Sequence, residues 1–222
     1  MITKNDLQLL PKYLDNLLND KKVFLVGFMA VGKTTIGKKL ASDLNLDFIS
    51  SGMLYRAIAS HFDIKGVNSF NEIQLTSKEP ITFVIDGETY TEKLLYSSKI
   101  NEKSSEIAQQ IEIRQIVSNV LRFLFESSSN GLVVEGRDMG SVVFQDADLK
   151  IYLDASESTR SKRRLAQSGS KESIEDLRNR DLRDINRKNS PLVVPEDALV
   201  IDNENMTIED VIKKIKENLK LQ

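Results

Sequence analysis

A glycine-rich stretch near the start of the chain constrains the fold more than any other feature. It matches the pattern Gly-x4-Gly-Lys-Ser/Thr and consists of Gly27, Phe28, Met29, Ala30, Val31, Gly32, Lys33, Thr34 and Thr35. The apolar run 23–26 before it predicts a buried strand. The apolar residues Ile36, Leu40 and Leu44 after it follow the spacing of one helix face. Strand, glycine loop and helix are the setting in which this pattern binds phosphate.

The chemistry of such a loop is carried mainly by its backbone. Glycines let successive N–H groups point inward, and the start of the following helix adds partial positive charge. Lys33 would supply a full charge to the β- and γ-phosphates of ATP, and the Thr34 hydroxyl would be a ligand of Mg²⁺. The alternative is a glycine turn that joins strand to helix and binds nothing, which the correct flanks on both sides disfavour.

Composition excludes several other classes of protein. The 222 residues carry 40% hydrophobic and 29% charged side chains, as in an ordinary globular protein. A net charge of -2 argues against a general nucleic-acid or membrane surface, and the lack of cysteine excludes disulfides and thiolate chemistry. No apolar run approaches the roughly 20 residues of a membrane span, and the first residues lack an apolar signal core. We therefore expect a cytoplasmic, monomeric protein without nucleic-acid or membrane partners.

Apolar periodicity elsewhere predicts an α/β fold. Short apolar runs predict four more core strands, at 47–49, 132–134, 149–153 and 198–201. Helical spacing predicts helices at 10–18, from 51 onward, at about 104–125 and from 208 onward. Alternation of apolar and polar residues predicts an antiparallel strand at 81–85. The polar, aperiodic segment 63–80 predicts a loop or mobile lobe. Strands that alternate with helices imply a five-stranded parallel sheet flanked by helices, with ligands at the carboxyl ends of the strands.

A basic segment lies between Arg160 and Lys188, with ten Lys and Arg against five Asp and Glu. Such a run is usually a solvated helix face. Here Arg180, Asp184 and Arg187 stand at i, i+4 and i+7, so they project from one side of a helix. A row of arginines beside a triphosphate would neutralise phosphoryl oxygens, and we expect the row to be functional.

The motifs after the glycine loop resemble those of the cytidylate kinases, a family of nucleoside monophosphate kinases. The matching stretches are Ser51-Gly52-Met53-Leu54-Tyr55-Arg56, Ile85-Asp86-Gly87-Glu88, Ser105-Glu106-Ile107-Ala108 with Arg114, the long run from Glu135-Gly136-Arg137-Asp138 to Ala155, and Arg180-Asp181-Leu182-Arg183-Asp184 with Arg187 and Ser190-Pro191-Leu192. The resemblance covers nearly everything from Val23 onward. It implies a P-loop fold and transfer of the γ-phosphoryl group of ATP to CMP or dCMP with Mg²⁺.

The resemblance also implies roles for individual residues. Those expected to contact the acceptor nucleotide are Ser51, Arg56 and Arg137 at its phosphate, Ser105, Arg114 and Asp138 at the cytosine edge, and Asp184 with Arg180 at the ribose. Arg187 would bridge the two phosphates, and the catalytic set would be Lys33, Arg137, Arg180 and Arg187. A carboxylate matches the amino donor of cytosine, whereas uracil would present an oxygen to Asp138. The alternative for Asp138 is a helix-capping aspartate.

Several positions depart from the family pattern. Ser50 stands where the family usually has Asp, Thr89-Tyr90 follows Glu88 where Asp-Val is usual, and the lobe between Arg56 and Ile81 is short. The loop interior, residues 28–31, is more similar to that of shikimate kinases. Two rival hypotheses therefore remain: another small-molecule kinase of the shikimate kinase type, and a catalytically weak nucleotide-binding protein.

The expected organisation is one P-loop kinase domain over residues 1–222. Within it we expect an N-terminal helical extension at about 1–20, an acceptor-binding lobe at about 51–112 and a lid at about 160–188. His61 lies in a helical stretch without a base partner in the sequence, so we interpret it as a surface or packing residue.

Overall fold

The structure is a computed structural model in which residues 22–78, 81–92, 95–168 and 173–220 are described. The helix expected at 10–18 lies outside these residues. The central sheet has the strand order β2-β6-β1-β7-β8, and all of its pairings are parallel. Its strands are β1 (Lys22–Gly27), β2 (Asp47–Ser50), β6 (Leu132–Glu135), β7 (Leu149–Asp154) and β8 (Leu199–Asp202). The expected five-stranded parallel sheet is confirmed, with each strand displaced by no more than a residue or two.

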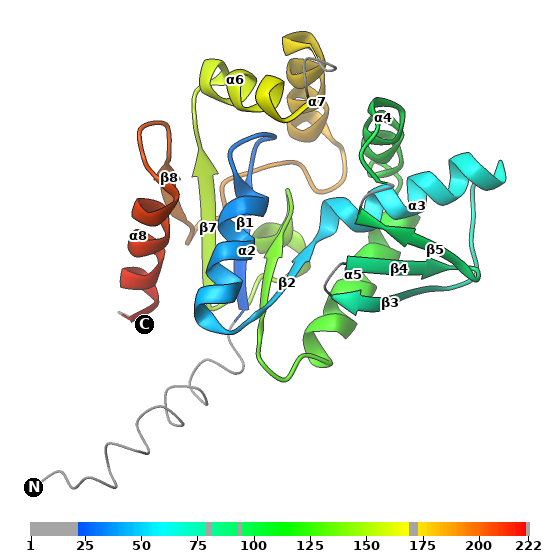
Figure 1. The fold of residues 1–222 in the computed structure, drawn as a ribbon, viewed down its shortest axis with the longest axis horizontal. Coiled ribbons are helices and arrows are strands. Elements are labelled where there is room, and N and C mark those ends of the chain that lie inside the picture. Colours follow the sequence, from blue (N-terminus) through cyan, green and yellow to red (C-terminus); the bar gives the residue numbers. More distant parts are fainter. Residues whose placement is uncertain (1–21, 79–80, 93–94, 169–172, 221–222) are drawn as a thin grey trace, which may run out of the picture.

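Helices cover both faces of this sheet (Figure 1). On one face α2 (Lys33–Leu44) and α8 (Ile208–Lys220) bury Leu40 and Ile212 against Val133, Ile151 and Ile201 of the strands. On the other face lie α3 (Ser51–Lys65) and α5 (Ile111–Glu126), where the core contains Met53, Val117 and Leu121 together with Leu132 and Val134. Successive strand residues thus face opposite layers, as the period of two requires.

A second sheet is antiparallel and packs against α3, next to the edge strand β2 of the central sheet (Figure 1). It consists of β3 (Ile73–Lys78), β4 (Ile81–Ile85) and β5 (Glu88–Thr91). The strand expected at 81–85 is confirmed. The loop expected at 63–80 is wrong in part, because α3 continues to Lys65 and residues from Ile73 onward pair with β4. β3 is polar, but it forms a strand because it can pair with the strongly apolar strand β4.

The single helix expected at 104–125 is also wrong, because two helices occupy this region. α4 (Ser98–Ile107) ends in tight turns, in which the N–H of Gln109 and of Gln110 donates to the carbonyl three residues earlier, at 3.0 Å each. α5 then starts after Gln110, whose backbone is extended. Neither Gly nor Pro marks the break, so local sequence carried no signal for it.

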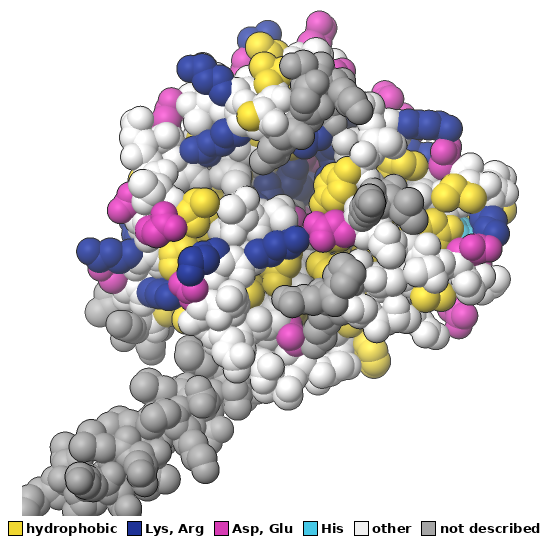
Figure 2. All heavy atoms as spheres, viewed as in Figure 1, with side chains coloured by type: hydrophobic (Ala, Val, Ile, Leu, Met, Phe, Trp, Pro, Cys, Tyr) yellow, Lys and Arg dark blue, Asp and Glu magenta, His cyan; other side chains and the backbone are white. Residues whose placement is uncertain are grey.

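His61 is buried in the lobe, with a ring nitrogen 2.9 Å from the hydroxyl of Tyr90 on β5. Its packing role is confirmed, whereas a surface position is wrong. The remaining helices, α6 (Glu157–Ser168) and α7 (Ile174–Asn186), lie beyond the carboxyl ends of the sheet strands (Figure 1). Positive and negative side chains are interspersed over the visible face (Figure 2). In the described part of the chain, no helix has the length and apolarity that a bilayer crossing requires.

Candidate active site

The glycine loop lies at the carboxyl end of β1 and leads into α2. Gly27 has φ +140°, and a Cβ there would lie 2.3 Å from the carbonyl oxygen of Leu153 on β7. Gly32 has φ +94° and caps the start of α2 in the left-handed region. Both positions therefore require glycine, one for close approach to the next strand and one for backbone conformation. Loop residues Met29, Ala30 and Gly32 and the first residues of α2 line the same cavity, as a phosphate site requires.

Lys33 is buried at the foot of this loop. Its Nζ donates hydrogen bonds to the carbonyl oxygens of Gly27 at 3.1 Å and of Phe28 at 2.6 Å. Burial holds the pKa of Lys33 well below its usual value, and the positive charge of Arg137 adds to the effect. An ammonium group held by carbonyls without an ion-pair partner in the described chain gains strongly from an incoming phosphate.

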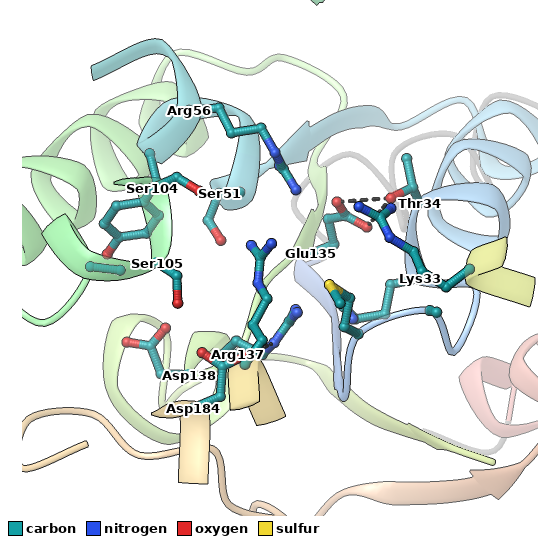
Figure 3. A pocket seen from close by; sticks show the side chains of 18 of the residues that line it. Lys33, Thr34, Ser51, Arg56, Ser104, Ser105, Glu135, Arg137, Asp138 and Asp184 are labelled. Carbon is teal, nitrogen blue, oxygen red and sulfur yellow. Dashed lines mark hydrogen bonds and ion pairs between the residues drawn. The ribbon is translucent and has the colours of Figure 1, made fainter. Parts of the chain in front are cut away.

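A carboxylate stands directly opposite Thr34, at the end of β6. The Thr34 hydroxyl donates to Glu135, with oxygen distances of 2.8 and 3.0 Å (Figure 3). The Ser50 hydroxyl donates to the same carboxylate. Mg²⁺ is bound by one or two carboxylates together with hydroxyl, water and phosphate oxygens. The oxygens of Thr34 and Glu135 beside the phosphate loop fit this ion. Ser50, where the family usually has Asp, contributes a hydroxyl that orients the Glu135 carboxylate.

The opposite end of the site contains a buried ion pair between α5 and the segment after β6. Nη2 of Arg114 donates to Oδ2 of Asp138, and Nη1 of Arg114 donates to the carbonyl of Ala108 at 2.7 Å. That carbonyl is available because α4 ends at Ile107. Burial opposes the charge of Arg114, but the neighbouring Tyr55 and Asp138 raise its pKa. Asp138 makes no helix-capping hydrogen bond with its side chain, so the capping alternative is wrong.

A second set of ion pairs joins Arg137, which follows β6, to Asp184 and Arg187 at the C-terminal end of α7. Nε of Arg137 donates to Oδ2 of Asp184 at 2.7 Å, while Nη1 of Arg187 lies 3.8 Å from Oδ1 of Asp184. Burial opposes ionisation of Asp184, but Arg137 and Arg187 hold its pKa below the usual value. Arg187 is buried, and its Nε and Nη2 have no hydrogen-bond partner in the described chain. The side chain of Arg187 lines the cavity, and these two buried donors have unused hydrogen-bonding capacity.

Two arginines in the cavity, Arg56 and Arg180, form no salt bridge with a carboxylate of the described chain. Burial lowers the pKa of Arg56. Burial, with Arg56 and Arg137 nearby, lowers the pKa of Arg180 to about 9. Since a carboxylate partner would raise these values, the cavity holds positive charge that the protein does not neutralise. Uncompensated guanidinium groups around a hollow are an anion-binding arrangement.

The basic helices are fixed to the glycine loop by Arg160 of α6. Its guanidinium lies over the ring of Phe28, 4.8 Å from the centroid, and Nη1 also pairs with Asp181 of α7. Despite this pair, burial raises the pKa of Asp181. Arg160 thus links α6, α7 and the glycine loop, which helps to position the arginines of α7.

These groups line one cavity of about 330 Å³, within the range of small-ligand sites. Figure 3 shows Lys33 and Thr34 on one side, Ser51 and Arg56 on the other, and Arg137 between them. Of the expected site residues the cavity wall includes Met29, Ala30, Gly32, Lys33, Thr34, Thr35, Ser51, Arg56, Ser105, Arg137, Asp138, Arg180, Asp184 and Arg187. Arg114 lies behind Asp138, while Gly27, Phe28 and Val31 are outside the wall and support the loop.

Eight wall residues were not among the expected site residues: Gly52, Tyr55, Tyr96, Ser104, Ala108, Glu135, Gly136 and Arg164. Glu135 could have been found, because a carboxylate at the end of a core strand faces the ligand edge of a parallel sheet. Tyr55 lies one residue before Arg56 on α3, and the centroid of its ring is 5.8 Å from the guanidinium carbon of Arg114. Tyr96 lies in an irregular segment before α4 and carries no sequence signal of a role.

A glycine loop with lysine, hydroxyl and carboxylate, facing a cavity rich in arginine, defines a P-loop phosphotransferase. Comparison with known proteins narrows this class. Residues 24–221 match the family model described as cytidylate kinase. The chain therefore belongs to the cytidylate kinase family, and the resemblance drawn from its motifs is confirmed.

Individual relatives agree with this assignment. The chain is 34% identical over 223 residues to the cytidylate kinase of Thermodesulfovibrio yellowstonii, covering 89% of this chain and 99% of that relative. It is 34% identical over 210 residues to the cytidylate kinase of Clostridioides difficile, covering 88% and 96%. Among solved structures, the shikimate kinase of Bacteroides thetaiotaomicron aligns with a TM-score of 0.52 and 15% identity, covering 90% of this chain and 98% of that one. The structural likeness, at this identity, supports the P-loop kinase fold alone.

Proposed function

We propose that the protein transfers the γ-phosphoryl group of ATP to CMP and dCMP, forming CDP or dCDP and ADP. The observation that carries the proposal is the buried Arg114–Asp138 pair at one end of a cavity whose other end is the phosphate loop. Between them lie the arginines without carboxylate partners, where two phosphates would meet. Membership of the cytidylate kinase family supports the same substrates.

Asp138 is the residue that would select cytosine. Its carboxylate is held toward the cavity by Arg114 and would accept a hydrogen bond from the exocyclic amino group of the base. Uracil presents a carbonyl oxygen at that position, so it would leave the buried carboxylate unpaired and repelled. Ser105 and Tyr55 line the same end, and Asp184 with Arg180 would take the ribose.

Transfer requires no strong general base, because the acceptor is already an anionic phosphate. Catalysis then depends on alignment and on neutralising charge that develops between the two phosphates. Lys33 would hold the β- and γ-phosphates, Ser51 and Arg56 the acceptor phosphate, and Arg137, Arg180 and Arg187 the space between them. We infer that α6 and α7, the segment of the expected lid at 160–188, close over both nucleotides and exclude water.

Mg²⁺ would be held by the Thr34 hydroxyl and the Glu135 carboxylate, with the remaining positions filled by phosphate and water oxygens. When bound, the ion neutralises phosphate oxygens and orients the γ-phosphoryl group. Ser50 restrains Glu135 by donating to one of its oxygens. The protein therefore fixes the metal carboxylate from two sides before any nucleotide enters.

The test is a coupled assay of ADP release with ATP, Mg²⁺ and one of CMP, dCMP, UMP or shikimate. We expect kcat/KM for CMP and dCMP to exceed that for UMP by about 100-fold or more, because rejection rests on a buried polar group. Shikimate should give no turnover above the hydrolysis background. Equal turnover of UMP would show that Asp138 does not select the base, and turnover of shikimate alone would assign the protein to the rival kinase class.

A variant sharpens the assay. Asp138→Asn can offer an amide donor to the uracil oxygen, so the ratio of CMP to UMP kcat/KM should fall while ATP affinity is retained. Lys33→Met serves as the matched inactive control, since it should abolish turnover with every acceptor.

A further inference from the structure

Arg56 is held differently from the other arginines of the site. It projects from α3 toward the segment that leads into α4, where its Nε donates to Oδ1 of Asn101 at 2.9 Å. Its guanidinium carbon lies over the ring of Tyr96, 4.9 Å from the centroid. Within the described chain, Arg114, Arg137 and Arg160 instead pair with carboxylates. Arg56 is thus fixed by an amide and an aromatic ring, neither of which carries negative charge.

The neutrality of these partners has a physical consequence. A carboxylate would orient the guanidinium equally well, but it would cancel the charge that an acceptor phosphate needs. A cation–π contact and an amide acceptor restrict the long side chain while leaving its full charge in the field of the cavity. Restricting a binding group in advance removes part of the entropy cost of ligand binding.

The position of Tyr96 suits this role. Its side chain lines the cavity, and the residue is 49% exposed, so its ring covers Arg56 from the solvent side without blocking the cavity. This ring lies on Arg56, the one arginine of α3. Figure 3 shows that the Arg56 side chain points into the cavity. In the described part of the chain, Arg56 is the only cation recorded over the Tyr96 ring.

The same helix also contributes to the base end of the cavity. Asn101 lies in the first turn of α4, while Ser104 and Ser105 lie one turn later and line the cavity wall. Ser104 donates to the carbonyl of Asn101 at 2.8 Å, which joins the two ends of this short span. α4 therefore positions the phosphate arm and part of the base pocket on one rigid element.

We propose that Tyr96 and Asn101 are positioning residues that hold Arg56, with its charge uncompensated, at the phosphate of the acceptor nucleotide. The proposal rests on the proposed function, because it takes the acceptor to be a nucleoside monophosphate. α4 would then set the distance between the residues that bind the base of the acceptor and Arg56, which binds its phosphate. Neither residue transfers a proton or touches the reacting atoms; both act through Arg56.

The experiment compares calorimetric binding of CMP with that of cytidine, which lacks the phosphate. For Tyr96→Leu we expect about a tenfold loss of CMP affinity, the effect of one partly desolvated cation–π contact, with cytidine affinity unchanged. Tyr96→Phe keeps the ring and should restore CMP binding to near the wild-type value. Asn101→Ala should act like Tyr96→Leu. Phe123→Leu, which alters an exposed aromatic residue of α5 outside the cavity, is the matched control and should alter neither affinity.

A double-mutant cycle with Arg56→Ala isolates the mechanism. If Tyr96 acts through Arg56, Tyr96→Leu should cost nothing further in CMP affinity once Arg56 is absent. Gly52→Ala gives an independent variant, because a Cβ there would lie 2.9 Å from Nη1 of Arg56 and would displace the guanidinium at little cost elsewhere. It should weaken CMP binding and spare cytidine.

Two outcomes would overturn the proposal while leaving the proposed function intact. One is an equal loss of CMP and cytidine affinity in Tyr96→Leu, which is the signature of a loosened lobe. The other is an undiminished effect of Tyr96→Leu in the Arg56→Ala background. Failure of the wild-type protein to bind or phosphorylate CMP would instead refute the proposed function itself.

Discussion

Nε of Arg137 donates to Oδ2 of Asp184 across 2.7 Å, although the two residues are 47 positions apart in the chain. The contact joins the end of β6 in the central sheet to α7. Asp184 also lies 3.8 Å from Arg187, so one carboxylate pairs with two guanidinium groups. The position of α7 over the phosphate loop therefore rests on Asp184 together with the Arg160–Asp181 pair.

Asp184→Asn should destabilise the free protein by about 3 kcal/mol, because removing one member of a buried ion pair leaves its partners uncompensated. Inorganic phosphate or ATP should recover part of that loss, since either supplies negative charge to the same arginines. Urea denaturation with and without 10 equivalents or more of ligand measures both effects. Glu88→Gln, which breaks an exposed pair with Lys65, is the control and should change stability little. An equal effect of the two substitutions would refute the central role of Asp184.

Arg187→Ala should lower kcat by about 100- to 1000-fold while changing the affinity for ATP little, because its contact strengthens as charge moves between the phosphates. The Nε and Nη2 donors of Arg187 are buried without a partner in the described chain, so a contact with substrate would require the side chain to move slightly. Steady-state kinetics and ATP binding separate the two quantities. The neighbouring exposed residue offers a control, and Lys188→Ala should behave as wild type. Normal turnover of Arg187→Ala would show that the side chain serves only to hold α7.

Glu135→Gln should weaken the apparent affinity for Mg²⁺ by about 10- to 100-fold, as loss of a metal-site carboxylate commonly does. A titration of Mg²⁺ at fixed ATP and CMP measures the shift, and Mn²⁺ binding followed by electron paramagnetic resonance gives a readout independent of turnover. Ser50→Ala should produce a smaller change in the same direction, because it frees the carboxylate without removing it. Chelation of divalent ions should abolish turnover. An unchanged Mg²⁺ dependence in Glu135→Gln would remove this residue from the metal site.

The parts of the fold that the sequence predicted share one property: their signal is local. The strand 23–26, the glycine loop and the helix after it are encoded by adjacent residues, and the structure agrees with all three. β6 and β7 are short apolar runs buried on both faces, which need no partner to be recognised, and the edge strands β2 and β8 are partly exposed but still short apolar runs. The resemblance to the cytidylate kinases likewise rested on contiguous motifs, and most of the residues implied by it line one cavity.

The missed features depend on contacts between distant segments. β3 forms because β4 is available to pair with it, and the break between α4 and α5 is stabilised partly by Arg114 binding the carbonyl of Ala108. Tyr96 acquires a role only when α3 brings Arg56 beneath it. Neither hydrophobic periodicity nor turn chemistry reports such relationships, because each reads a window of neighbouring residues.

The connection between β6 and β7 has a consequence for how this region tolerates change. It contains a π-helical turn (η2, Met139–Val143), in which the carbonyl of Asp138 accepts from the N–H groups of Val142 at 2.9 Å and Val143 at 3.2 Å. A π turn is a helical turn widened by one residue. Deleting one residue there would tighten the turn and pull either Asp138 away from Arg114 or β7 out of register with β1. Side-chain substitutions along this turn can be accommodated by repacking of its neighbours. A change in the length of the turn would instead move Asp138, the residue proposed to select the base.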